Sequence, residues 1–249
     1  KAAADADDST SLVELLDPLP LSEALRELLH LSVDDRILVL SLIPAELAAE
    51  LIEEAPAEAA ADLLEGLTAI RAAEIMEELD SDVQADLIGD LDAEDAEAIL
   101  SEMDSDDAAD VRRLVAYDDD TAGGLMVAEA FSFSNTQTVG KVLRDLARAD
   151  DDSERYRGQH PYVIDGDGKP VGVVSLRGLL TSKRSDFLTT IMTPPLTVPV
   201  DMSLFNLEDI FDEHAFLGIP VVEADGTLVG TVSRAAVSAA ALERSESES

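Results

Sequence analysis

The sequence contains no cysteine among its 249 residues. Without cysteine the chain forms no disulfide, binds no metal through thiolates and performs no thiol chemistry. Lysine is scarce too, because only four of the 17 basic residues are Lys and the other 13 are Arg. Phosphate binding requires a basic stripe, and the sequence has none, so we expect no nucleic-acid partner.

Long hydrophobic runs are also missing. ILVLSLI (37–43) is the longest strongly apolar run of the first half, far short of the roughly 20 residues that span a membrane. No segment at Lys1 resembles a signal peptide. We therefore expect a soluble, cytoplasmic chain. Because no pore-forming segment follows Leu242, we do not expect this chain to transport a solute itself.

Features of an enzyme are absent as well. The three histidines, His30, His160 and His214, fall in different predicted elements and share no metal-ligand spacing. The sequence has no nucleophile elbow, no P-loop and no Rossmann glycine pattern. We predict that the chain is not an enzyme.

Acidic residues, in contrast, are abundant: 54 Asp and Glu give a net charge of -37. Residues 1–120 hold 35 of them with 6 basic residues, which is a net charge of -29 for that half. Since 46% of the residues are hydrophobic, the chain can still bury a core. An acid-rich, lysine-poor surface suits cytoplasm near molar salt, as in a halophile, because salt screens the repulsion. The alternative is that the acids are a local device for binding cations.

A repeat of 12 residues runs from Ala48 to Val115. Each unit opens with small residues, and apolar pairs follow three and four positions later, as in AAELIEEA (48–55), AADLLEGL (60–67) and AAEIMEEL (72–79). That spacing predicts one buried face of a short helix. Pro44, Pro56, Thr68, Asp80, Asp92 and Asp104 separate the units as breakers or caps. We predict an α-superhelix, preceded by two further helices in residues 11–43, with Pro18 and Pro20 interrupting the first of them.

A different repeat follows residue 126. A strand at AFSF (130–133), a helix at 138–149, a hairpin at PYVIDGDGKPVGVVS (161–175) and a short helix at LRGLL (176–180) form one β-α-β-β-α unit. A second unit starts at IMTPPLTVPV (191–200), with its helix at 203–214, its hairpin at IPVVEADGTLVGTVS (219–233) and a closing helix at 234–242. Two such units usually pack face to face, because each leaves one side of its sheet uncovered.

These units resemble a tandem pair of CBS domains, named after cystathionine β-synthase. Together with an acidic superhelix and YDDDTAGGLM (117–126), they resemble the cytosolic region of MgtE-family magnesium transporters. LVLSLIPAELAAELI (38–52) and GVVSLRGLL (172–180) stand in the family's order. The resemblance implies a fold of class α + α/β. It places the helical domain at 1–122, the CBS domains at 123–190 and 191–242, and a disordered tail at 243–249.

The resemblance also implies a function. In that family the cytosolic region senses Mg²⁺, and ions between the acidic domain and the CBS domains favour a compact state that closes the pore. The family's carboxylate pair after an E-E-L turn corresponds to Asp82 and Asp86, and the bridging carbonyl corresponds to Gly124. An alternative is that the glycine pair forms a domain corner without an ion. Acid pairs four residues apart are also frequent by chance in so acidic a half.

This chain departs from the family pattern in two places. Ala235 and Ala236 stand in the closing helix where carboxylates are expected, so at least one ion site has lost ligands. In CBS pairs that bind adenine nucleotides, an Asp accepts hydrogen bonds from the ribose, and Gly178 and Ala236 replace it here. His160, Ser175 and Arg177 can still form a weakened nucleotide site. Alternatively, Ser175 is a helix cap.

The leading hypothesis is therefore a Mg²⁺-responsive regulatory module of an MgtE-like transporter. It would lie at the inner face of the plasma membrane and work with a pore in cis or in trans. By resemblance we expect a homodimer formed through the CBS domains. The alternatives are a CBS regulator that binds adenine nucleotide without sensing metal, and a structural scaffold whose superhelix docks a protein.

Overall fold

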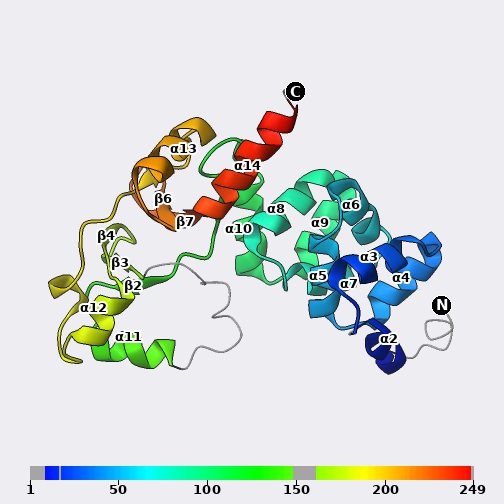
Figure 1. Cartoon of the computed structure of the whole chain (residues 1–249), viewed down its shortest axis with the longest axis horizontal. Coiled ribbons are helices and arrows are strands. Elements are labelled where there is room, and N and C mark those ends of the chain that lie inside the picture. The colour runs from blue at the N-terminus through cyan, green and yellow to red at the C-terminus, as the bar shows by residue number, and fades with distance from the viewer. Residues whose placement is uncertain (1–8, 17, 148–160, 248–249) are drawn as a thin grey trace. The chain divides into compact units, whose positions relative to one another are not determined.

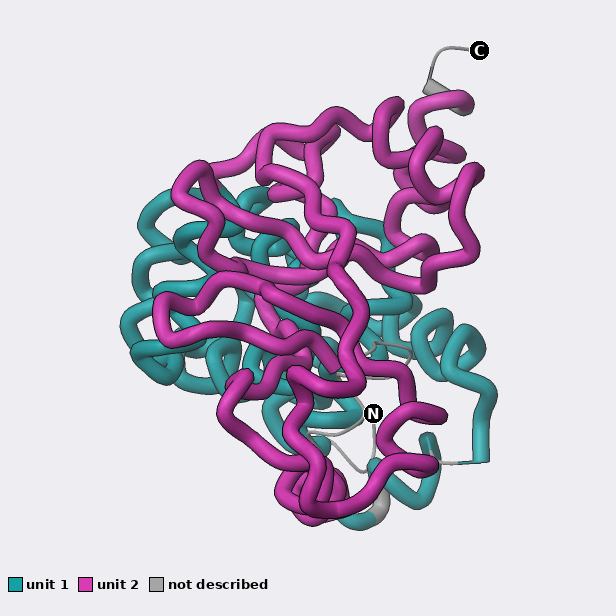
Figure 2. The backbone as a smooth tube through the Cα atoms, turned by 90° about the vertical axis from the view of Figure 1, so that its left-hand side faces the viewer, with its two compact units in different colours: residues 1–115 teal, residues 116–249 magenta. Residues whose placement is uncertain are grey.

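Short consecutive helices make up the first of two compact units, residues 1–115, in the computed structural model (Figure 1). Figure 2 colours this unit apart from the second, residues 116–249. The structure describes residues 9–16, 18–147 and 161–247. In the described part of the first unit, the helices are α2 (Ser9–Leu16), α3 (Leu21–Leu29), α4 (Val33–Leu42), α5 (Ala45–Glu53), α6 (Ala57–Glu65), α7 (Ala69–Met76), α8 (Ser81–Asp90), α9 (Ala93–Glu102) and α10 (Ser105–Leu114).

The 12-residue repeat is confirmed by where the helices begin. From α5 to α10 each helix starts 12 residues after the one before, and the predicted caps directly precede them: Pro44, Pro56, Thr68, Asp80, Asp92 and Asp104. The Thr68 hydroxyl accepts a hydrogen bond from the Arg71 N–H at 3.3 Å, and the Asp104 carboxylate accepts one from the Asp106 N–H at 2.9 Å. These side chains satisfy N–H groups that the first helical turn leaves unpaired.

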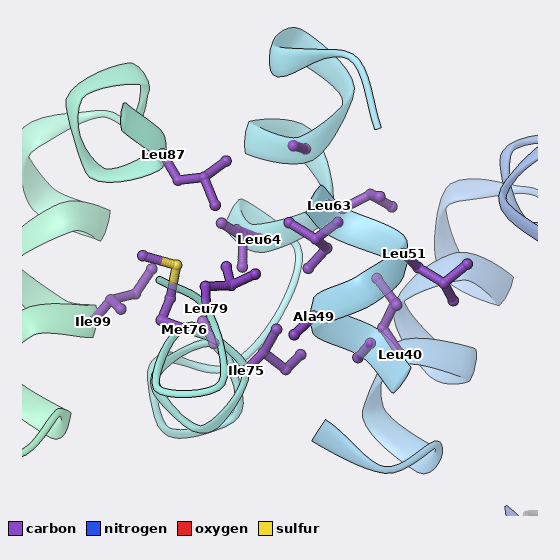
Figure 3. Close-up of a cluster of buried hydrophobic side chains, with 14 of the residues drawn as sticks. Leu40, Ala49, Leu51, Leu63, Leu64, Ile75, Met76, Leu79, Leu87 and Ile99 are labelled. Carbon is purple, nitrogen blue, oxygen red and sulfur yellow. The ribbon is translucent and has the colours of Figure 1, made fainter. Parts of the chain in front are cut away.

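The small and apolar positions of the repeat form the core of this unit. Ala48, Leu51, Ile75 and Met76 are fully buried, and Figure 3 shows side chains from successive helices meeting there. A helix of nine or ten residues is marginal alone, so each depends on the faces of its neighbours. The alanines that open three of the units, Ala48, Ala60 and Ala72, are buried in this core.

Before the repeat, the structure has three helices where two were predicted. The predicted first helix is two helices, because Pro18 and Pro20 lie between α2 and α3, and Pro20 is the N-cap of α3. Ser32 begins α4, since its hydroxyl accepts from the Asp35 N–H at 3.4 Å. The Arg36 guanidinium donates to the Leu29 and Leu31 carbonyl oxygens, which closes the end of α3.

The second unit contains two sheets. The strands are β1 (Met126–Val127), β2 (Ser132–Ser134), β3 (Tyr162–Ile164), β4 (Pro170–Val173), β5 (Val198–Pro199), β6 (Gly218–Val222) and β7 (Leu228–Ser233). The helices are α11 (Val139–Leu146), α12 (Leu176–Thr181), α13 (Leu204–Glu213) and α14 (Arg234–Ser247), with a 3₁₀ turn at Leu188–Thr190. We call β2-β3-β4 with α11 and α12 the first module, and β1-β7-β6-β5 with α13 and α14 the second module.

In each module a helix connects two parallel strands and a hairpin follows. The parallel pairs are β2 with β3 and β5 with β6, and the hairpins are β3-β4 and β6-β7. The hairpin turns need glycine, since Gly168 and Gly226 have φ of 76° and 90°. The two hairpins touch, because the Leu228 N–H donates to the Gly168 carbonyl oxygen at 3.0 Å.

Strand β1 lies in the sheet of the second module, although it precedes the first module in the sequence. It pairs antiparallel with β7, with Met126 opposite Val232. Met126 is fully buried there. The segment that connects the two units therefore enters the second unit as an edge strand of the second module.

The closing helix is longer than predicted. α14 extends to Ser247, past the expected end at Leu242, so residues up to Ser247 are helical and not part of a disordered tail. Residues 243–247 include Glu and Arg, which favour a helix. The Arg244 guanidinium also pairs with the Glu208 carboxylate of α13 at 2.9 Å, which holds the extension against the module.

Candidate functional site

Helix α8 carries the predicted carboxylate pair. Asp82 and Asp86 are four residues apart and lie on one side of the helix, with Asp82 partly buried and Asp86 exposed. The Asp82 carboxylate accepts a hydrogen bond from the Val83 N–H at 2.9 Å. Both side chains supply oxygen, the ligand atom that Mg²⁺ prefers.

A buried glutamine fixes the position of this helix. The Gln84 side-chain amide donates to the carbonyl oxygens of Met76 and Leu79, both at 2.8 Å, and Gln84 is only 3% exposed. Those carbonyls belong to the end of α7 and its corner, where the last acceptors of a helix lack their usual intrahelical donors. The Met76 carbonyl also accepts from the Leu79 N–H at 3.0 Å. Gln84 thus joins two repeat units and sets the orientation of the first turn of α8.

The glycine pair lies in a tight turn at the start of the second unit. The Leu125 N–H donates to the Thr121 carbonyl oxygen at 3.0 Å, and the Gly124 N–H donates to the Thr121 hydroxyl at 3.4 Å. Neither Gly123 nor Gly124 has positive φ, so conformation does not explain why both are glycine.

Close packing explains both glycines instead. A Cβ on Gly123 would lie 2.5 Å from the Tyr117 ring, and a Cβ on Gly124 would lie 2.4 Å from the Asp118 carbonyl oxygen and 2.8 Å from the Asp119 Cα. The chain turns back on itself so tightly that no side chain fits at either position. Among the described residues, no group donates a hydrogen bond to the Gly124 carbonyl oxygen.

Main-chain hydrogen bonds hold this turn to the second module. The Ala122 N–H donates to the Met202 carbonyl oxygen and the Gly123 N–H to the Val200 carbonyl oxygen, both at 2.8 Å. The Leu204 N–H donates to the Asp120 carbonyl oxygen at 2.8 Å. These bonds fix the Gly124 carbonyl relative to the second module.

The predicted metal ligands belong to different units. Asp82 and Asp86 lie in the first unit and Gly124 in the second, so their joint role stays a prediction. Within the described ranges, no group of three or more His, Asp or Glu side chains is arranged to hold a metal ion. The alanines of the closing helix, Ala235 and Ala236, lie in the first turn of α14 and provide no ligand.

The predicted nucleotide residues are only partly brought together. Ser175 caps α12, since its hydroxyl accepts from the Gly178 N–H at 3.0 Å, which confirms the capping alternative. Arg177 is exposed in the first turn of that helix. His160 lies outside the described residues. A Cβ on Gly178 would lie 3.2 Å from the Ser175 hydroxyl, a contact that a small movement of this side chain relieves.

A tyrosine between the two modules escaped the sequence reasoning. Tyr162 of β3 is 2% exposed, and its burial raises the pKa of the hydroxyl to about 12, although the neighbouring Thr231 hydroxyl of β7 opposes this shift. The charged form of a buried phenol is disfavoured because it loses its hydration. The PYVID pattern identified Tyr162 as a strand residue, but not as a residue that contacts the other sheet.

Comparison with known protein families matches nearly the whole chain. The family model described as MgtE intracellular N domain matches residues 19–120, and the one described as CBS domain matches residues 122–184 and 186–243. The magnesium transporter MgtE of Thermus thermophilus is 36% identical over 126 residues, which are 50% of this chain and 28% of that protein. The match thus spans less than a third of that transporter's length.

Solved structures agree with this assignment. The cytosolic domain of the Mg²⁺ channel MgtE in complex with ATP is 30% identical, with a TM-score of 0.83 over 96% of this chain and 97% of that one. The soluble part of a magnesium transporter, at 22% identity, has a TM-score of 0.80 over 98% of this chain and 95% of that one, which shows a shared fold. The predicted superhelix followed by a CBS pair is therefore confirmed. None of the helices described in the structure has the length and apolar character needed to cross a bilayer.

Proposed function

Because the chain belongs to the MgtE family, of which it holds the intracellular N domain and the CBS pair, we propose that it is the Mg²⁺-sensing regulatory module of a magnesium transporter. Mg²⁺ would bind the Asp82 and Asp86 carboxylates of the helical unit and the Gly124 carbonyl oxygen of the CBS unit. The bridged state would be compact and would favour a closed pore. The role is regulatory and not enzymatic.

The observation that carries this proposal is how Gly124 is held. Its carbonyl oxygen is fixed by the packing of the turn and by bonds to the second module, and it receives no donor within the described residues. A preorganised oxygen with no protein partner suits a hard cation. Mg²⁺ keeps several of its waters, so a site with few protein ligands is sufficient.

Electrostatics gives the switch its direction. The first 120 residues carry a net charge of -29, and nearby carboxylates repel one another unless a cation lies between them. A cation that binds only the compact arrangement shifts the population towards it. High salt screens the repulsion and weakens the site, so we expect a Mg²⁺ threshold in the millimolar range or above.

Scattering measurements test this proposal. In about 2 M KCl, MgCl₂ should reduce the radius of gyration, whereas KCl added to the same ionic strength should not. The Asp82→Asn/Asp86→Asn variant should lose the response. Glu46→Gln/Glu50→Gln is the matched control, because it removes two charges with the same spacing from an exposed face of α5 and should still respond. A Mg²⁺ response that survives in the aspartate variant would contradict the site.

A second candidate function is adenine-nucleotide binding by the CBS pair. Similarity to a cytosolic MgtE domain in complex with ATP favours it. The replacement of both ribose-binding aspartates, by Gly178 and Ala236, argues for weak binding, because an unpaired ribose hydroxyl forfeits about 1–3 kcal/mol. Calorimetric titration of the wild type and of Arg177→Ala with ATP tests it. Equal heats of binding with both proteins would exclude Arg177 from the nucleotide site.

The pore and the oligomeric state complete the proposal. The pore would belong to the same protein or to a separate one at the inner face of the membrane, and the CBS pairs of two copies would form a homodimer. Exposed apolar side chains on the module helices, Leu176 and Leu180 of α12 and Phe205 of α13, supply a surface of the kind that such a dimer needs. Sedimentation equilibrium measures the state directly.

A further inference from the structure

A long-range hydrogen bond ties the start of the acidic junction, residues 117–124, to the second module. The Tyr117 hydroxyl donates to the Glu223 carboxylate at 2.6 Å, across a partly buried contact between residues 106 positions apart. That length falls within the range of charge-assisted O–H···O⁻ bonds. Glu223 is held in turn by the β6-β7 hairpin, where its N–H donates to the Thr227 carbonyl oxygen at 2.9 Å.

The ring of the same tyrosine packs on the glycine turn. A Cβ on Gly123 would meet the Tyr117 ring atoms at 2.5, 2.8 and 2.9 Å, so the ring occupies the space that a side chain would fill. Tyr117 thus contacts the turn through its ring and the hairpin through its hydroxyl. The glycine turn and the β6-β7 hairpin of the second module thus meet at one side chain.

The contact determines where the chain can pivot. The first unit ends at Val115, the C-cap of α10, and the second begins at Ala116, directly before Tyr117. With Tyr117 held, the joint between the units is confined to residues 115–116. Without it, the next long-range main-chain bond is the one to the Asp120 carbonyl, and before it only local bonds from Thr121 to the Asp118 carbonyl hold the chain. The joint would then extend to residues 115–120 at most, a segment with three adjacent carboxylates.

We propose that the Tyr117–Glu223 hydrogen bond is a latch that confines this joint, which makes Tyr117 a positioning residue for the regulatory site at Gly124. The regulatory part of this inference rests on the proposed function. A shorter joint raises the effective concentration of the metal-binding carboxylates of the first unit near the Gly124 carbonyl of the second. Lengthening a flexible joint from two to six residues lowers that concentration by up to about fivefold, following its three-halves power dependence on length.

Hydrogen–deuterium exchange without Mg²⁺ tests the latch itself. Tyr117→Phe keeps the ring on Gly123 and removes only the hydroxyl, and Glu223→Leu removes the acceptor. Each should speed exchange in residues 117–121, and the double variant should exchange no faster than either single variant, because both remove the same bond. Glu213→Gln, an exposed charge in α13 of the same module, is the control and should match wild type.

The Mg²⁺ response then tests the positioning role. In Tyr117→Phe the Mg²⁺ concentration at half-maximal compaction should rise, by up to about fivefold. Unchanged exchange in both single variants would overturn the latch. Faster exchange with an unchanged Mg²⁺ midpoint would overturn the positioning role. If wild type itself does not compact, the proposed function fails, and the exchange data alone decide the latch.

Discussion

Replacing Gly124 by alanine is a direct probe of the junction. The added Cβ would lie 2.4 Å from the Asp118 carbonyl oxygen, and the nearest atoms are backbone, which cannot rotate away. Ordinary van der Waals contact begins near 3.4 Å, so the Asp118 backbone must move by about 1 Å. That oxygen also accepts from the Thr121 hydroxyl at 2.6 Å and the Thr121 N–H at 3.1 Å, and the movement disturbs both bonds.

From this geometry we expect Gly124→Ala to lower the free energy of unfolding of the second unit by about 1–3 kcal/mol, the usual range for overpacking. Gly89→Ala is the matched control. Gly89 is exposed near the end of α8, and a Cβ there would meet nothing within 4 Å. Alanine favours a helix over glycine, so that variant should gain about 0.5–1 kcal/mol.

The distribution of aromatic residues makes the assay specific. All three Tyr and six Phe residues lie beyond residue 116, and the chain has no Trp, so near-ultraviolet circular dichroism reports on the second unit alone. Urea is the suitable denaturant because it is uncharged and leaves the salt concentration unchanged. The two units can unfold separately, so each transition is fitted by itself.

The urea midpoint shows whether residue 124 packs tightly against Asp118. A lower urea midpoint for Gly124→Ala in the near-ultraviolet signal, with Gly89→Ala unchanged in that signal, supports the tight turn described here. Equal midpoints for Gly124→Ala and wild type would refute the close approach of residue 124 to Asp118. The packing argument for a fixed Gly124 carbonyl oxygen would then fail.

Two further predictions concern buried polar groups. Gln84→Leu should destabilise the first unit by about 1–3 kcal/mol, as measured by urea unfolding followed in the far ultraviolet. The variant removes the donor of the Leu79 carbonyl and leaves the Met76 carbonyl with only the Leu79 N–H. Burial raises the pKa of Tyr162 to about 12, so the folded state stays protonated where the unfolded chain ionises. The free energy of unfolding therefore contains the full contribution of this group below pH 10 and should fall by about 2 kcal/mol as the pH rises to 12. Tyr162→Phe should not show that fall.

Local patterns in the sequence predicted much of the fold. The start of every helix from α5 to α10 followed from caps and alanine spacing, because each helix contacts its near neighbours and the repeat keeps one register. The two hairpins followed from Asp-Gly turns, which need positive φ at Gly168 and Gly226. In both cases the determining residues lie within a few positions of the element that they form.

Long-range contacts escaped prediction. The pairing of β1 with β7 joins residues near 126 and 232, and no local pattern specifies which sheet a two-residue strand enters. The Tyr117–Glu223 bond had no sequence signal either, since Glu223 is one acid among 54. The extension of α14 depends on Arg244 reaching Glu208, again a tertiary contact.

The residues of the candidate site were likewise only partly predictable from local sequence. The glycine pair stood out in the sequence, but its physical reason, the packing of Tyr117 and Asp118 against it, required the structure. Ser175 followed from its position before a short helix. Asp82 and Asp86 were selected by family resemblance, because many other acid pairs of this half share their spacing.

The most direct measurement for the central claim is the distance between the two units with and without Mg²⁺. Because the chain has no cysteine, Gly89→Cys in α8 and Ser238→Cys in α14, both exposed, give two unique labelling positions. Pulsed electron spin resonance on the doubly labelled protein, in KCl of matched ionic strength, reads out the distance distribution. We predict that Mg²⁺ makes it narrower and that Asp82→Asn/Asp86→Asn abolishes the change. The same distribution with and without Mg²⁺ in the labelled wild type would contradict a metal-bridged switch.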